Sequence, residues 1–355
     1  MSWVVFRCHK IPADASIRKG YHMNSELPSR LPRRPIQYQY SATRFIFFEL
    51  GSDPNLRGGV RPRFRLTSAN ERIMRLLLRS LVAGLLLGAL GPSVARATWS
   101  VIAVDLSTGR IVIASATCVD RDDAFLKGVQ AVVVPGKGIA ACQAGVDNTH
   151  ANQMLVFAEL QKGTEPEKIL ELLSADPAFQ SRQFGILDLQ GRSAGHSGLS
   201  NGYVTQDIQG RVPGTQIYYS IQGNILRPGE VVPKAVQAFL STNGAITDRV
   251  MAAMDAADAA GGDSRCNCPP PPEDGSAPAI PCESKTAHVA YILMAERNDT
   301  NGDSHNNGKY TMYLTVNQPT QGGPNAIKPG ENLNPVKTLR MRYDAWRKQQ
   351  PSSFK

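Results

Sequence analysis

The sequence lacks an apolar stretch long enough to cross a bilayer. The apolar run Leu81–Leu90 has ten residues, whereas a helix needs about 20 predominantly apolar residues to span the hydrocarbon core. We therefore expect no stable membrane span.

Residues 98–355 also lack an excess of positive charge. The whole chain has 355 residues and a net charge of +9. Residues 1–97 hold 16 of the 39 Lys and Arg and 5 of the 30 Asp and Glu, so the other 258 residues hold 23 and 25 and carry a net charge of −2. Because nucleic-acid binding depends on a basic surface, we expect no nucleic-acid partner.

Residues 1–73 lack a sustained helical or strand period and are rich in Arg and Pro. Two interpretations stay open: an upstream extension of the reading frame, with translation starting at Met74, or a disordered basic segment. The sequence favours the first, because a secretory signal belongs at the N-terminus.

Residues 74–97 have the three parts of a secretory signal peptide. A basic start and the apolar run end at Gly91-Pro92, and the small-residue site Ala95-Arg96-Ala97 follows. Cleavage after Ala97 leaves Thr98 as the first residue, whereas cleavage after Ala95 leaves Arg96 in front of it. The pattern predicts a periplasmic or secreted protein.

Beyond the leader, ten strands and five helices are predicted, with four strands before the first helix. Apolar alternation and turn residues predict strands at 98–104, 111–116, 129–134, 138–144, 183–187, 193–197, 204–209, 216–222, 288–295 and 310–316. Helices are expected at 148–161, 166–174, 231–241, 246–260 and 335–349. This order favours antiparallel sheets covered by helical layers.

Several short motifs, spread over nearly all of residues 98–349, resemble one family. They are Thr98-Trp99-Ser100 with Asp105 and Thr108-Gly109, Ala141-Cys142-Gln143-Ala144, Gln183-Phe184-Gly185-Ile186-Leu187-Asp188 with Gly191-Arg192, Gln222-Gly223-Asn224-Ile225-Leu226, Ala259-Ala260-Gly261-Gly262-Asp263-Ser264-Arg265, and Asn334-Pro335-Val336 with Leu339-Arg340. In this order they resemble domain-of-unknown-function family 1028, which consists of bacterial and archaeal proteins with an N-terminal nucleophile (Ntn) hydrolase-type fold.

The resemblance implies an α+β fold, a four-layer αββα sandwich of two antiparallel sheets. We expect this domain at 98–320, with a Cys- and Pro-rich insert at 266–284, followed by a linker and a C-terminal helix at 321–355 that packs on the domain. The insert departs from the family pattern. In the family a Gln-Ser pair usually comes after the Gly-Gly-Asp-x-Arg motif, and because the insert takes its place here, no role of that pair carries over to this chain.

Thr98 is the candidate nucleophile. A threonine at a free N-terminus carries a hydroxyl and, in its own α-amino group, a base whose unperturbed pKa is about 7.7–8.0. The competing interpretation is that Thr98 only starts a strand, which threonine favours.

Four further residues are candidates for the same site. Asn224 follows a glycine and is our candidate oxyanion donor, and Gln143 could donate from the end of an inner strand. Asp263 and Arg265, after Gly261-Gly262, could orient the α-amine. Each also has an ordinary interpretation as a turn residue, a helix end or a surface ion pair.

The cysteines favour disulfides over metal. Cys266, Cys268, Cys282 and His288 match no standard zinc spacing, and an oxidising compartment favours a disulfide, with Cys282 paired to Cys266 or Cys268. Cys118 and Cys142 pair with each other or are small buried residues.

Two other motifs fail on inspection. Gly195-His196-Ser197-Gly198 has Leu199 where a nucleophile elbow needs glycine. Asp299-x-Asn301-x-Asp303 starts like a calcium loop but lacks its later glycine and glutamate, so a polar hairpin loop is preferred.

Together these observations predict an exported Ntn-type amidohydrolase acting on an amide of a small molecule or peptide, without cofactor or metal. The alternative is a non-catalytic binding module of the same fold at the cell envelope. The substrate and the oligomeric state stay open.

Overall fold

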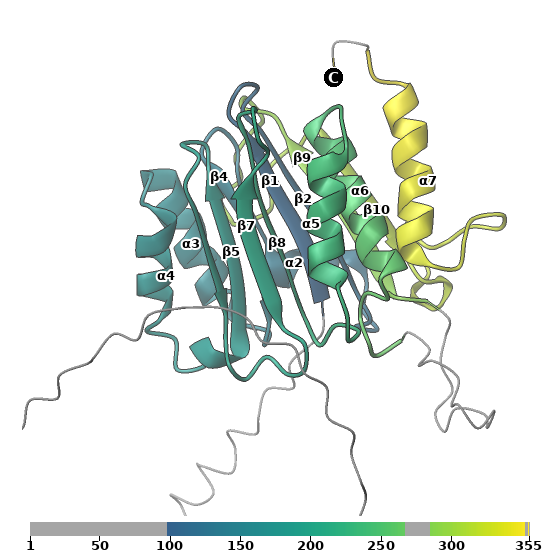
Figure 1. The fold of residues 1–355 in the computed structure, drawn as a ribbon, viewed down its shortest axis with the longest axis horizontal. Coiled ribbons are helices and arrows are strands. Elements are labelled where there is room, and N and C mark those ends of the chain that lie inside the picture. Colours follow the sequence, from purple (N-terminus) through teal and green to yellow (C-terminus); the bar gives the residue numbers. More distant parts are fainter. Residues whose placement is uncertain (1–97, 267–284, 352–353, 355) are drawn as a thin grey trace, which may run out of the picture. The chain divides into compact units, whose positions relative to one another are not determined.

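The computed structural model describes residues 98–266, 285–351 and 354. These residues form two antiparallel sheets (Figure 1). The six-stranded sheet has the order β10-β9-β2-β1-β8-β7, and the four-stranded sheet the order β3-β4-β5-β6. The strands are β1 Thr98–Asp105, β2 Arg110–Thr117, β3 Ala131–Val134, β4 Gly138–Ala144, β5 Arg182–Asp188, β6 Ser193–Ser197, β7 Gln206–Arg211, β8 Ile217–Asn224, β9 Val289–Ala295 and β10 Met312–Asn317.

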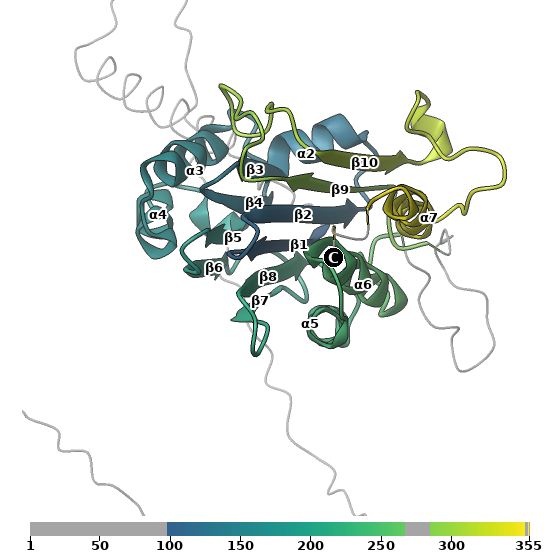
Figure 2. The same ribbon diagram turned by 90° about the horizontal axis from the view of Figure 1, so that it is seen from above.

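Helices cover the outer face of each sheet. On the four-stranded sheet lie α3 (Ala151–Lys162) and α4 (Pro166–Leu173), and on the six-stranded sheet lie α5 (Val231–Ser241), α6 (Ile246–Ala259) and α7 (Pro335–Lys348). Seen from above, the two helical layers flank the two sheets (Figure 2). The α+β fold with two antiparallel sheets is confirmed, and its arrangement is that of an αββα sandwich.

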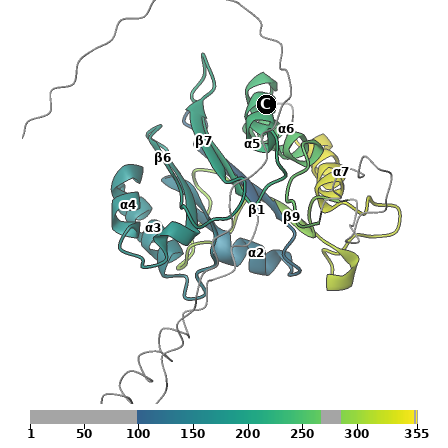
Figure 3. The same cartoon turned by 60° about the horizontal axis from the view of Figure 1, so that its bottom comes forward.

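The two remaining sides of the sandwich differ. The edge strands β6 and β7 contact each other and join the two sheets on one side. On the other side, α2 (Asp123–Gln130) contacts β3 and β4 of one sheet and β9 and β10 of the other. Figure 3 shows both features, with β6 beside β7 and α2 below the strands. Two short 3₁₀ turns, η1 (Phe179–Ser181) and η2 (Pro319–Gln321), complete the described elements.

Strand alternation decides which residues face which layer. Successive side chains of a strand point to opposite faces, so Trp99 and Val101 of β1 belong to the core under α5, α6 and α7. Ile102 and Val104 belong to the core between the sheets. Thr98 and Ser100 share the parity of Ile102, so their side chains also point between the sheets.

The helix α2 corrects the prediction of four strands before any helix. Residues 129 and 130, expected in a strand, are the last residues of this helix, and the strand starts at Ala131. The side chain of Asp122 accepts a hydrogen bond from the backbone N–H of Phe125 at 2.9 Å and caps the helix. This eight-residue helix was not predicted because a β-branched run directly follows it and its last two residues were assigned to that strand.

The start of α3 is a second correction. We expected a helix from 148 with Asn148 or Thr149 as its cap, but α3 starts at Ala151 after His150, which has a left-handed backbone conformation. The carboxylate of Asp147 accepts hydrogen bonds from the backbone N–H groups of Thr149 and Asn152. These bonds hold residues 147–150 in a turn.

Candidate active site

Thr98 is the first residue of β1, a central strand of the six-stranded sheet. Its side chain points between the sheets, and the residue is 4% exposed. The Thr98 hydroxyl Oγ1 lies 3.2 Å from Oγ1 of Thr117, at the end of the neighbouring strand β2, within hydrogen-bond distance. The hydroxyl is therefore held in a defined position inside the fold.

Arg265 and Asp263 reach this position through Thr117. Asp263 is fully buried and forms an ion pair with Arg265, with 2.7 Å between Oδ2 and Nη2. The same guanidinium nitrogen donates to Oγ1 of Thr117 at 3.4 Å. A second constraint comes from the backbone N–H of Cys118, which donates to Oδ2 of Asp263 at 2.8 Å.

A disulfide fixes the same corner. Cys118 and Cys266 are bonded, with Cα atoms 5.9 Å apart and 148 positions between them in the sequence. Of the two interpretations of Cys118 and Cys142, the pairing with each other is therefore wrong, whereas Cys142 is, as the other interpretation has it, a free buried residue. Of the two partners expected for Cys282, Cys266 is excluded because it is already paired, and the alternative Cys268–Cys282 stays a prediction because both residues lie outside the described ranges.

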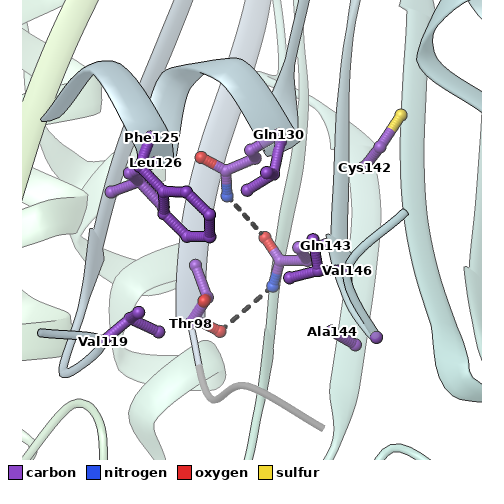
Figure 4. A pocket seen from close by; sticks show the side chains of 11 residues that line it. Thr98, Val119, Phe125, Leu126, Gln130, Cys142, Gln143, Ala144 and Val146 are labelled. Atoms are coloured by element: carbon purple, nitrogen blue, oxygen red, sulfur yellow. Dashed lines mark hydrogen bonds between the residues drawn. The ribbon is translucent and has the colours of Figure 1, made fainter. Parts of the chain in front are cut away.

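Gln143 lies at the centre of the polar contacts around Thr98. Its side-chain Nε2 donates to the backbone carbonyl of Thr98 at 3.0 Å and to Oε1 of Gln183 at 2.8 Å. Its Oε1 accepts from Oγ of Ser100 at 2.7 Å and from Nε2 of Gln130 at 2.8 Å. One buried amide thus joins the start of β1 to the facing sheet and to α2 (Figure 4).

The polar contacts continue on both sides of Gln143. Gln183 donates to Oγ of Ser197 at 2.8 Å and to the carbonyl of Gly223 at 3.1 Å. Tyr291 donates to Oε1 of Gln130 at 2.8 Å. Burial raises the pKa of Tyr291 well above its ordinary value, so the Tyr291 hydroxyl remains a hydrogen-bond donor at every physiological pH.

Asn224 is paired with Thr98 in the register of β8 and β1. It is fully buried, and residues directly opposite in an antiparallel pair point to the same face. Its Nδ2 lies 3.5 Å from the carbonyl of Asn201. The next residue, Ile225, has a φ of 48°, a conformation that is rare and strained for a β-branched side chain.

A second left-handed residue lies on the facing sheet. Ala144 follows Gln143 and has a φ of 74°. Both candidates from strand ends, Gln143 and Asn224, are therefore followed by an unusual backbone conformation. Such residues cluster at functional sites more often than elsewhere.

A small pocket adjoins Thr98. Apolar side chains form most of its walls, with Phe125, Leu126 and Val129 from α2 on one side and, on the other, Ala144 at the end of β4 and Val146 after it. Its free volume is about 20 Å³, which holds roughly one water molecule. Cys142 also borders the pocket, but Figure 4 shows its sulfur pointing away from Thr98. Burial raises the pKa of that thiol.

The structure therefore brings the five predicted residues to one end of the layer between the sheets. Four of them, Thr98, Gln143, Asp263 and Arg265, are connected by hydrogen bonds, directly or through Thr117. Asn224 joins them through the strand register.

Sequence reasoning missed four members of the cluster: Ser100, Thr117, Gln130 and Gln183. A signal for two of them was present, because Ser100 is polar and alternates in β1 with the apolar Trp99 and Val101, and Gln183 starts a motif already recognised. Gln130 had no such signal, because its helix was not predicted.

The motifs set aside in the sequence have structural roles. The carboxylate of Asp299 accepts hydrogen bonds from the backbone N–H groups of Glu296 and Thr311. His196 stacks on Phe179 with 3.8 Å between ring centroids. Within the described ranges 98–266, 285–351 and 354, no group of three or more His, Cys, Asp or Glu side chains is placed to hold a metal ion.

Comparisons with known proteins identify one family. Fold and site define an αββα protein of two antiparallel sheets with a polar cluster at the start of a central strand. Residues 98–270 match the model of a family of unknown function, DUF1028, and this part of the chain belongs to that family.

One solved structure and the curated proteins complete the comparison. Protein SPO2555 from Silicibacter pomeroyi, whose crystal structure is described with the DUF1028 family model, is 20% identical, with coverage of 73% of this chain and 91% of that chain and a TM-score of 0.49. No curated protein matches the chain. In the part that the structure describes, no helix is both long and apolar enough to span a membrane.

Proposed function

We propose that this protein is an exported N-terminal-nucleophile amidohydrolase, in which removal of the leader at residues 74–97 makes Thr98 the first residue. The observation that carries the proposal is the position of Thr98. It starts a central strand, its hydroxyl is buried and within 3.2 Å of a neighbouring hydroxyl, and its carbonyl is held by Gln143.

The chemistry needs only groups on this residue and water. The neutral α-amine accepts the proton of the Thr98 hydroxyl as Oγ1 attacks the carbonyl carbon of an amide. The carbon–nitrogen bond of the tetrahedral intermediate then breaks, and the protonated α-amine gives its proton to the leaving amine. Water hydrolyses the resulting ester, which releases a carboxylic acid and restores the Thr98 hydroxyl.

The surrounding residues supply position and charge. We assign the stabilisation of the oxyanion to the side-chain amide of Asn224, which is opposite Thr98 in the strand pair. Arg265, held by Asp263, fixes Thr117 and through it the nucleophile. Gln143 fixes the backbone carbonyl of Thr98 and so the direction in which the residue enters β1.

The proposal includes the remaining sequence assignments. Residues 1–73 are an upstream extension, the domain comprises 98–320 with the insert 266–284, and 321–355 form a linker and the C-terminal helix. The disulfide Cys118–Cys266 agrees with a periplasmic or secreted location. The substrate is an amide of a small molecule or peptide, and no cofactor takes part.

Substitution of the nucleophile tests the proposal. In protein recovered from the exported full-length chain, Thr98→Ser should retain amide hydrolysis, whereas Thr98→Ala should lower the rate by about 10⁴-fold or more. The matched control is Thr338→Ala in α7. It also removes a buried threonine hydroxyl, in this case one that donates to the backbone carbonyl of Asn332, and it should leave the rate unchanged.

A screen of peptide and aryl amides supplies the substrate for this test. Equal turnover by the wild type and Thr98→Ala would rule out the nucleophile. Binding of amides without turnover by any form would favour the non-catalytic binding module.

A further inference from the structure

The pocket beside Thr98 limits what the site can accept. An acyl carbon attacked by the Thr98 hydroxyl must lie about 3–3.5 Å from Oγ1, and Thr98 itself lines this pocket. The alkyl side group of the acyl part therefore enters the space between α2 and the segment after β4, and an α-amino group on the acyl part stays outside this space.

The free volume sets the size of the substituent. About 20 Å³ is available, which accommodates one water-sized or methyl-sized group. A branched or long side chain would require Phe125 and Leu126 of α2 to move, and Leu126 is only 3% exposed within the core between the sheets.

The lining sets the polarity of the substituent. Among the described residues that line the pocket none is charged, and the polar side chains are Thr98, Gln130 and Gln143. The two glutamine side chains are hydrogen-bonded to each other. A charged substituent would lose its hydration there without gaining a partner.

On the basis of the proposed hydrolase activity, we propose that the substrate is an alanyl or acetyl amide, whose methyl group enters the pocket while the α-amino group of an alanyl substrate stays outside it. Figure 4 shows the ring of Phe125 and the side chain of Gln143 converging on the pocket from opposite sides. Phe125 is the residue that limits size, because it is the largest wall residue and is only half-buried, so it can be changed without opening the core.

A panel of acyl amides with one leaving group tests the inference. The wild type, recovered from the exported full-length chain, should cleave alanyl or acetyl amides with a kcat/KM at least about tenfold above that for leucyl, lysyl and glutamyl amides. The alanyl and acetyl arms decide which methyl-bearing group is preferred. Cleavage with equal or higher efficiency for leucyl amides would overturn the size limit and leave the hydrolase proposal intact.

Two pocket variants and one control sharpen the result. Phe125→Ala should enlarge the pocket and raise the leucyl-to-alanyl ratio about tenfold, whereas Val119→Leu should fill it and lower the alanyl rate. Phe179→Ala is the matched control, because Phe179 is also a half-buried phenylalanine and lies outside the pocket. A changed ratio in the control, or an unchanged ratio in Phe125→Ala, contradicts the assignment.

The absence of hydrolysis for every amide would refute the proposed function. In that case a binding experiment still tests the pocket assignment. NMR titration of the wild type with alaninamide and leucinamide should then show shifts of residues 119–130 with alaninamide only. Equal shifts, or none, would overturn the pocket assignment as well.

Discussion

The two ends of the layer between the sheets have opposite chemistry, although the same strands build both. In β1 the inward residues are Thr98 and Ser100 at one end and Ile102 and Val104 at the other. In β5 they are Gln183 and Leu187. The apolar end gains stability from close packing of fully buried aliphatic side chains.

The polar end is stabilised differently. Each hydrogen bond contributes only about 1 kcal/mol net, and a buried amide without a partner is costly. A chain selected for stability alone would continue the aliphatic pattern to the ends of its strands. The polar cluster around Gln143 is the feature on which the proposed chemistry at Thr98 depends.

Space between the sheets is adapted to this cluster. Gly185 lies opposite β8, where a Cβ atom would come within 2.6 Å of Oγ of Ser220 and 2.9 Å of Oε1 of Gln222. A larger residue at position 185 would require the side chains of Ser220 and Gln222 to shift.

The largest effect on stability is expected from removing the crosslink at the polar end. Replacing both Cys118 and Cys266 by Ser should lower the free energy of unfolding by about 2–5 kcal/mol. It should also slow amide hydrolysis, because the backbone of Cys118 holds Asp263. Chemical denaturation measures the first effect and a rate assay the second.

The buried free Cys142 supplies the control for this experiment. Cys142→Ala breaks no crosslink and should cost clearly less stability than the double variant. An equal loss would mean that the disulfide does not hold this end together.

The apolar end should respond to truncation in stability alone. Ile113 is fully buried, so Ile113→Ala should cost about 2–5 kcal/mol in denaturant unfolding through lost burial and a cavity. The kcat of the folded fraction should stay unchanged. A fall in kcat comparable to that of a variant at the polar end would break the distinction between the two ends.

Replacing Gln143 should lower both the stability and the kcat, each moderately. Gln143→Leu removes the partner that Ser100, Gln130 and Gln183 share. Gln130 and Gln183 keep their hydrogen bonds to Tyr291 and Ser197, so the total loss of stability should be about 1–3 kcal/mol. The substitution also frees the carbonyl of Thr98, so kcat should fall while KM changes less. A hydrolysis assay measures the effect on kcat and thermal unfolding measures the effect on stability. An unchanged kcat would show that Gln143 has only a structural role.

The smallest effect is expected at His305, which supports α2 from outside. Its Nε2 donates to the carbonyl of Gly128 at 2.8 Å, and its ring stacks on His150 with centroids 5.3 Å apart. Burial, with smaller contributions from His150 and Lys127, lowers the pKa of His305 below the ordinary value of 6.5.

The sign of the pH effect follows from that shift. The unfolded chain binds a proton at His305 at a higher pH than the folded chain does, so stability falls as the pH drops through 6.5 towards the folded pKa. His305→Gln should remove this part of the slope when unfolding is measured between pH 5 and 7.5. An unchanged slope would exclude His305 as its source.

The sequence predicted strands better than long-range contacts. Alternation located β4 and β6 with correct ends, and the helix starts at Pro166 and Pro335 were predicted correctly, because these signals are local. The helix α2 was missed because eight residues beside a β-branched run carry little periodic signal. The disulfide pairing could not be deduced, since spacing does not determine which cysteines meet.

In the candidate site, too, residues with a local sequence signal were predicted and residues defined by long-range contacts were missed. Thr98 stood out by its position at the predicted leader junction, and Asn224 and Gln143 stood out by their positions in recognisable motifs. Thr117 and Gln130 did not, because their importance comes from contacts between β2, α2 and the facing sheet that only the folded chain creates.

The mature N-terminus tests the central claim most directly. N-terminal sequencing or mass spectrometry of protein recovered after export of the full-length chain should give Thr98 with a free α-amine. A mature chain that starts at Arg96 or any earlier residue, or whose Thr98 amine is blocked, would contradict the account, because the hydroxyl would then have no base of its own.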